Sequence, residues 1–214
     1  MSGALPFRAP LFPIAGAILF PRAQLPLHIF EPRYRTMIAD AIDGDGLIAV
    51  VQPKAEESDL NPKPPLFEVG CAGEIAGLEE LEDGRFNIIL TGAHRFRIVE
   101  EIDLGTPYRV ADLDVGAFDD RKPPPLEMAR RAEVEQEARR LGDVLGLSVD
   151  WGAVSRLDDE ILVNAIAQVA PFDVSAKQAL IESESLEQRA DLLVQLMQFL
   201  RLSQGGAELQ PTLQ

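Results

Sequence analysis

Residues 25–42 read LPLHIFEPRYRTMIADAI, an extended apolar stretch that runs directly into an amphipathic helix. Pro32 suits the first helical position because its ring fixes φ near the helical value and its missing N–H would have no partner there. Glu31 precedes it, close to the positive end of the helix dipole. From this start one helical face carries the apolar residues Tyr34, Met37, Ile38, Ala41 and Ile42. The Asp-Gly-Asp-Gly run at 43–46 then ends the predicted helix.

Short strands and a long loop are predicted around this helix. The run LIAVV at 47–51 is short and wholly apolar, which is typical of a buried strand. Residues 15–20 lie between Pro13 and Pro21 and are also expected to form a strand, because proline disfavours a helix there. Residues 53–66 contain four prolines and predict a long surface loop. Loops of this length often carry function, so this one is a binding candidate.

The next section, up to residue 115, is typical of a β-sheet. Asp83-Gly84 separates two strand-like runs, 67–81 and 86–92, and Asp-Gly in this position predicts a hairpin. Two further strands are predicted at 94–103 and 108–115. About six strands and one helix are therefore expected before residue 116. Short strands joined by close turns favour a small closed or nearly closed barrel.

The composition changes at the proline run 123–125, which neither helix nor sheet can cross. We therefore expect a barrel subdomain at 1–120, a helical bundle at 121–204 and a flexible tail at 205–214. Helices are predicted at 126–141 and 158–169. Two more begin at S-x-x-Q capping boxes, formed by Ser175 with Gln178 and by Ser185 with Gln188. Gly205-Gly206 is expected to end the last helix.

The overall charge narrows the classes of partner. The chain has 20 Lys and Arg against 35 Asp and Glu, a net charge of −15, so its surface repels nucleic-acid phosphates. One cysteine and two histidines provide too few ligands for a structural zinc site, and no metal or cofactor is predicted. The apolar stretch from Leu11 to Phe20 is broken by proline, and no apolar run of membrane-spanning length follows. The sequence thus predicts a cytoplasmic protein.

Several long sequence blocks resemble one known family, the Lon protease N-terminal domain, and in particular its stand-alone bacterial members. The first block begins at Pro10 and reads PLFPIAGAILFPRAQLPLHIFEPRYRTMIADAI. Further blocks are VGCAGEI at 69–75, EDGRFNIIL at 82–90 and TGAHRFRI at 91–98. The helical part contributes NAIAQVAPFDVSAKQALIESESLEQRADLLVQL at 164–196. The resemblance covers nearly the whole chain and is weakest over residues 116–155.

The resemblance implies an α+β fold, a PUA-like small β-barrel with one embedded helix, followed by a C-terminal α-helical bundle. It also implies a non-enzymatic module that binds unfolded or extended polypeptide segments, as a substrate-recognition domain or adaptor in protein quality control, alone or with a Lon-type protease. The ATPase and Ser-Lys peptidase activities of full-length Lon are not implied, because the chain has no G-x-x-x-x-G-K-[ST] motif. RNA binding is the alternative, since PUA-like barrels of other families bind RNA.

The candidate peptide-binding residues combine a local concentration of arginine with neighbouring aromatic side chains. Arg95 and Arg97 alternate along one predicted strand, so we expect them to share a face opposite Phe96. The full candidate set is His28, Phe30, Tyr34, Arg35, Arg95 and Arg97. Ion pairs with Glu31, Glu100 or Glu101 are the structural alternative for the arginines, and core packing is the alternative for Phe30 and Tyr34. No catalytic residue is predicted, and Cys71 is expected in the core.

Overall fold

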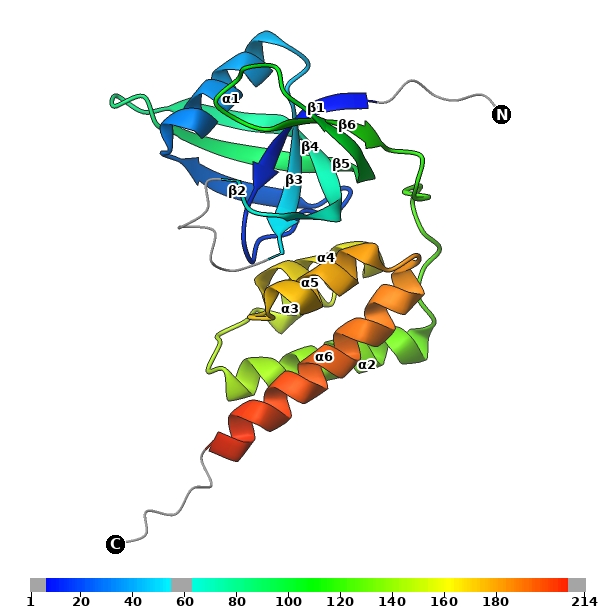
Figure 1. The fold of residues 1–214 in the computed structure, drawn as a ribbon. Coiled ribbons are helices and arrows are strands. Elements are labelled where there is room, and N and C mark those ends of the chain that lie inside the picture. Colours follow the sequence, from blue (N-terminus) through cyan, green and yellow to red (C-terminus); the bar gives the residue numbers. More distant parts are fainter. Residues whose placement is uncertain (1–6, 55–62, 208–214) are drawn as a thin grey trace, which may run out of the picture. The chain divides into compact units, whose positions relative to one another are not determined.

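The computed structural model describes residues 7–54 and 63–207, which form a mixed α+β fold (Figure 1). The chain divides into two compact units, Met1–Arg121 and Lys122–Gln214. Most of the loop predicted at 53–66 lies outside the described residues, as do the last seven residues of the predicted tail. No described helix has both the length and the apolar character needed to span a membrane.

The first unit contains six strands and one helix among the described residues. They are β1 (Phe7–Pro13), β2 (Gln24–Ile29), α1 (Pro32–Asp43), β3 (Leu47–Pro53), β4 (Leu66–Glu80), β5 (Phe86–Ile102) and β6 (Val110–Asp114). Figure 1 shows these strands curling into a strongly bent sheet with α1 at its margin. The predicted hairpin is confirmed, because Glu80 of β4 is paired with Phe86 of β5 across the turn that contains Gly84.

The strand pairings close on themselves. The sheet order is β2-β5-β4-β3-β1-β6, and β6 pairs additionally with β5. β5 makes this possible by its length, because its first half pairs with β2 and its second half pairs with β6. All the pairings are antiparallel except that of β1 with β3. The apolar side chains that face inward include Leu11, Phe96 and Leu113, each with no exposed surface.

The helix α1 forms where the sequence predicts it. Pro32 is its first residue, Glu31 is the N-cap, and Gly44 follows its last turn. Four of the five predicted apolar residues are buried, but Ile42 is 44% exposed, so its predicted burial is wrong. Each four-residue step advances about 40° beyond a full turn, and Ile42 therefore lies about 80° around the helix from Tyr34.

The strand predicted at 15–20 is wrong, because these residues have no regular structure and the strand lies earlier, at Phe7–Pro13. Ile18, Leu19 and Phe20 are nevertheless buried. A turn in which Ala23 N–H donates to the Phe20 carbonyl oxygen brings this segment against Gly92. The apolar run thus indicated burial rather than secondary structure.

The two strands predicted at 86–92 and 94–103 are one continuous strand, β5. Gly92 is paired with Gly73 and His94 with Ala72, so Ala93 is an extra residue at a β-bulge. A bulge of this kind bends a strand without ending it. The residue between the two predicted strands therefore forms a bulge and not a turn.

The second unit contains α2 (Met128–Val144), α3 (Trp151–Val154), α4 (Asp159–Val169), α5 (Val174–Glu182) and α6 (Leu186–Ala207). The helices α2 and α6 pack along each other (Figure 1). An ion pair of 2.7 Å joins Arg130 to Asp191. The short helix α3 was not predicted. Its N-cap is Asp150, whose side chain accepts a hydrogen bond from Ala153 N–H.

The predicted helix boundaries in this unit are partly correct. Ser185 caps α6 by accepting from Gln188 N–H at 3.1 Å, which confirms that start. The cap predicted at Ser175 is wrong, because Asp173 occupies the capping position of α5 and accepts from Ala176 N–H at 2.7 Å. The predicted end at 204 is also wrong, since α6 continues to Ala207. Glycine costs about 1 kcal/mol in a helix relative to alanine, which weakens a helix without ending it.

Two glycines of β4 provide a test of the close packing in the sheet. A Cβ atom at Gly70 would lie 2.3 Å from the Val50 carbonyl oxygen, whereas a Cβ atom at Gly77 would lie 3.4 Å from its nearest neighbour, in Ile89. We expect Gly70→Ala to destabilise the protein by about 1–3 kcal/mol or more, because backbone must move. Gly77→Ala should stay within about 0.5 kcal/mol of wild type. Urea unfolding followed by circular dichroism measures both, and equal losses would contradict this packing.

Candidate functional site

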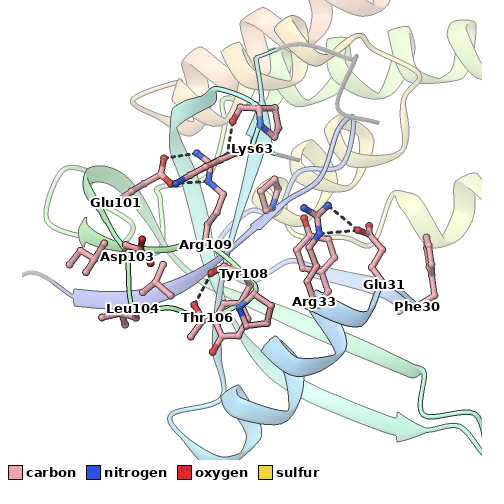
Figure 2. A pocket seen from close by; sticks show the side chains of 16 residues that line it. Phe30, Glu31, Arg33, Lys63, Glu101, Asp103, Leu104, Thr106, Tyr108 and Arg109 are labelled. Atoms are coloured by element: carbon pink, nitrogen blue, oxygen red, sulfur yellow. Dashed lines mark hydrogen bonds and ion pairs between the residues drawn. The ribbon is translucent and has the colours of Figure 1, made fainter. Parts of the chain in front are cut away.

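A cleft of about 820 Å³ opens on the first unit (Figure 2). Four segments line it: Pro13 at the end of β1, residues 30–34 where β2 leads into α1, Lys63-Pro64 ahead of β4, and residues 101–110 between β5 and β6. The stretch that determines the start of α1 therefore also builds one wall of the cleft.

The opposite wall is a short loop held in shape by its own hydrogen bonds. Asp103 Oδ1 accepts from Gly105 N–H at 3.0 Å, and Thr106 Oγ1 donates to the Tyr108 carbonyl oxygen at 2.8 Å. Gly105 has a φ of +72°, a value that glycine adopts without strain. Leu104 is 54% exposed within this loop. The loop thus presents an apolar side chain from a well-defined backbone.

Arg109 joins the loop to the neighbouring segments. Its Nε and Nη2 atoms donate to the two carboxylate oxygens of Glu101 at 2.8 and 2.5 Å, and its Nη1 atom donates to the Pro64 carbonyl oxygen at 2.6 Å (Figure 2). These hydrogen bonds from Arg109 lower the pKa of Glu101, and the positive charge of Lys63 acts in the same direction. Both members of the pair are therefore charged at neutral pH.

A second ion pair lies on the wall formed by α1. Arg33 Nε donates to Glu31 Oε2 at 2.9 Å, and its guanidinium carbon lies 4.5 Å from the centre of the Tyr34 ring (Figure 2). The Tyr34 ring in turn packs 4.6 Å from the ring of Phe12. Stacking and the ion pair together fix the guanidinium over the aromatic ring.

The other tyrosine of the cleft is a structural anchor. Tyr108 Oη donates to Asp40 Oδ2 at 2.7 Å, which ties the loop to α1. Burial, together with the Asp40 carboxylate, raises the pKa of Tyr108 to about 12. The hydroxyl therefore remains a donor at neutral pH.

The cleft combines paired charges with exposed apolar groups, a composition suited to reversible binding. The described charged residues that line it are Arg33, Lys63 and Arg109 against Glu31, Glu101 and Asp103. Phe30 is 61% exposed and Leu104 is 54% exposed. No group of three His, Cys, Asp or Glu side chains among the described residues is arranged to hold a metal ion.

Only two of the six predicted peptide-binding residues, Phe30 and Tyr34, line this cleft. His28 lies in a separate groove of about 500 Å³ between β2, β5 and β4. There its Nδ1 atom is 2.8 Å from Asn87 Oδ1 and its Nε2 atom is 3.1 Å from an Arg85 nitrogen. Both partners belong to β5 or to the turn that precedes it.

The three predicted arginines lie at three different places. The guanidinium of Arg35 lies against the β4–β5 turn at Gly84. Arg95 is 2% exposed, because Asp120 pairs with it at 2.7 Å and Phe118 stacks on its guanidinium. Arg97 has a half-exposed side chain paired with Glu68. Arg95 and Arg97 lie two positions apart on β5, but the segment after β6 covers Arg95, so the two guanidinium groups do not form one exposed surface.

Sequence reasoning missed the wall at 101–110. One signal was available: Leu104 is a large apolar residue in a short turn between two predicted strands, a position that is usually polar. The ion pair of Arg109 with Glu101 had no such signal, since many arginines and carboxylates of this chain could pair.

The chain matches the family model of the ATP-dependent protease La (LON) substrate-binding domain over residues 8–198. It is 28% identical over 204 residues to Lon protease 2 of Myxococcus xanthus, covering 90% of this chain and 24% of that protein. It is 25% identical over 197 residues to Lon protease 2 of Thermus thermophilus, covering 91% of this chain and 24% of that protein. The chain thus spans about a quarter of the length of these relatives.

Solved structures show the same fold. The crystal structure of a Lon N-terminal domain protein from Xanthomonas campestris matches with a TM-score of 0.64 and 17% identity, covering 88% of this chain and 98% of that one. The N-terminal domain of a Mycobacterium avium complex Lon protease matches with a TM-score of 0.63 and 15% identity, covering 90% and 98%. The α+β expectation is confirmed as the Lon N-terminal domain fold.

The ion pair of Glu101 with Arg109 predicts a pH-dependent contribution to stability. Because the pKa of Glu101 is lowered on folding, the pair stabilises the folded state above the ordinary pKa of 4.5, and this contribution is lost as the pH falls through the folded pKa. We expect Glu101→Gln to cost about 1 kcal/mol at pH 7 and progressively less below pH 4. Urea unfolding at pH 7 and pH 3 measures the difference, with the exposed Glu100→Gln as control. A cost that is the same at both pH values would contradict the assignment.

Proposed function

This chain belongs to the Lon substrate-binding domain family, and we propose that it binds unfolded or extended polypeptide segments in the cleft without catalysing a reaction on them. The observation that carries this proposal is the exposure of Phe30 and Leu104 on the two walls of one cleft. Large apolar side chains in a concave site are typical of binding surfaces, because a ligand removes them from water. The fixed ion pairs beside them keep the walls in place before a ligand arrives.

The physiological role that we propose is substrate recognition in protein quality control, in the cytoplasm, as an adaptor or together with a Lon-type protease. The family assignment supports this role, and so do the relatives that are Lon proteases. We further propose that the closed circuit of strand pairings is the PUA-like β-barrel implied by the sequence resemblance. The family assignment by itself specifies neither the physiological partner nor the type of barrel.

RNA binding is the weaker alternative. The chain carries a net charge of −15, and in the cleft lining Arg33 is paired with Glu31, Arg109 is paired with Glu101, and the charge of Lys63 acts on Glu101. Binding to a phosphate backbone depends on releasing counterions through unneutralised Lys and Arg, and it weakens steeply with salt. A polypeptide held by apolar contacts would bind with little dependence on salt.

Charge placed on either cleft wall should weaken this binding. We expect Leu104→Asp and Phe30→Asp each to weaken binding of a labelled, reduced and carbamidomethylated lactalbumin by about tenfold or more, because an exposed contact residue becomes charged. Val99→Asp is the control, since Val99 is 62% exposed on β5 outside the cleft lining. Fluorescence anisotropy at 0.1 and 0.5 M salt measures the affinities. An equal loss of affinity in all three variants would contradict the assignment of the cleft as the binding site.

The non-enzymatic part of the proposal has its own test. The sequence contains no P-loop motif, and the described residues of the cleft lining include no Ser, Cys or His. We therefore expect the purified protein to release no phosphate from ATP and no fragments from casein above a buffer blank. Turnover that is retained through purification and lost on a single substitution would contradict this expectation.

A further inference from the structure

The hydroxyl of Tyr34 is available to a ligand in the cleft. Tyr34 is 7% exposed and lines the cleft, and among the described residues its hydroxyl has no hydrogen-bond partner. Its oxygen is also absent from the fully enclosed polar atoms that lack a partner, so it retains access to solvent. Tyr108 provides the contrast, because its hydroxyl is already occupied by Asp40. A buried tyrosine normally uses its hydroxyl, so an open donor in a cleft indicates a contact with a ligand.

The surroundings of Tyr34 determine the kind of group that this hydroxyl would contact. Burial raises the pKa of Tyr34, while the charges of Arg33 and Arg109 lower it and that of Glu31 raises it. The hydroxyl therefore lies among charged groups of the cleft and remains protonated at neutral pH. A protonated hydroxyl in this setting needs a hydrogen-bond acceptor.

The charge of the cleft favours a neutral acceptor. Arg33 is paired with Glu31, and Arg109 is paired with Glu101 and with a main-chain carbonyl group. The described charged residues of the lining balance, three of each sign. An anionic ligand would have to compete with carboxylates that already hold these guanidinium groups, at the surface of an acidic protein. A main-chain carbonyl oxygen is a strong acceptor without net charge, and every extended polypeptide provides it.

We propose that the Tyr34 hydroxyl donates a hydrogen bond to a main-chain carbonyl oxygen of the bound segment, and that the cleft selects extended segments whose central side chains are uncharged. This inference rests on the proposed polypeptide-binding function and assigns Tyr34 as a residue that determines specificity. Phe30 and Leu104, on either side of the cleft, would contact apolar side chains of the same segment. Main-chain recognition explains how one cleft accepts many sequences, since the contacted carbonyl group is common to all of them.

The test uses the full chain and a fluorescein-labelled peptide of twelve uncharged residues, with one central Phe and with both ends blocked. We expect Tyr34→Phe to keep the melting temperature of wild type and to weaken binding by about five- to tenfold, the usual effect of one hydrogen bond. Val99→Asp, at an exposed position of β5 outside the cleft lining, is the control, and it should retain the affinity. A peptide with Glu on both sides of the central Phe should bind more weakly than the uncharged peptide to wild type.

A scan of the peptide identifies the acceptor. Amide groups are replaced one at a time by esters, whose carbonyl oxygens are weaker acceptors. We expect one replacement to weaken binding to wild type but not to Tyr34→Phe, which is the non-additivity of two groups in contact. A third peptide with a free C-terminus separates a main-chain carbonyl group from a terminal carboxylate.

Three results would overturn the inference. If Tyr34→Phe binds like wild type while Leu104→Asp does not bind, the hydroxyl has no role although the proposed function stands. If the free C-terminus strengthens binding to wild type alone, the acceptor is a carboxylate. If the Glu-flanked peptide binds as well as the uncharged one, the proposed selectivity is wrong. A failure of wild type to bind any peptide or unfolded lactalbumin would instead count against the proposed function itself.

Discussion

The fold of the first unit depends on one strand, β5, that pairs with three others. β5 pairs with β4 along one edge, and along the other edge it pairs first with β2 and then with β6. No second strand of the unit carries as many partners among the described residues. The arrangement requires a strand long enough for two partners and a bulge that redirects it midway, at Ala93. It also requires backbones to pass very closely, which is why Gly70 and Gly92 lie where a Cβ atom would meet a carbonyl oxygen. Both walls of the cleft are continuations of strands whose positions β5 determines.

The cleft owes its shape to charges that are satisfied within its own walls. Glu31 with Arg33 and Glu101 with Arg109 each join neighbouring parts of one wall, and Tyr108 joins the loop to α1 through Asp40. Partly exposed ion pairs contribute little to the free energy of unfolding. The bidentate contact of one arginine and the stacking of the other nevertheless restrict the conformations that the wall side chains can adopt. The conformational entropy of these side chains is then lost on folding and not on ligand binding. This is the physical basis for treating the cleft as preformed.

The sequence predicted those features that depend on local chemistry and missed those that depend on distant partners. Pro32, the Asp-Gly hairpin and the cap at Ser185 are local, and each lies where it was predicted. The buried segment 18–20 was predicted as a strand because hydrophobicity indicates burial, whereas its packing against Gly92 depends on a residue more than 70 positions later in the chain. The candidate site was predicted only where it coincides with the start of α1. Arg95 was placed on the surface because nothing in its neighbourhood identifies Asp120, 25 residues later, as its partner.

The pair formed by Arg95 and Asp120 also determines where the first unit can be separated from the rest of the chain. Asp120 follows the last strand by several residues, and a boundary drawn at the end of β6 would remove it. Arg95 would then lose both its carboxylate partner and the Phe118 ring that stacks on its guanidinium, and the face of β5 that this segment covers would be exposed to solvent. The backbone oxygen of Asp120 additionally accepts from Arg22 at 2.7 Å. A fragment of the first unit that keeps these contacts must therefore extend past β6 to include Asp120. The same boundary applies wherever this unit is joined to a different partner domain.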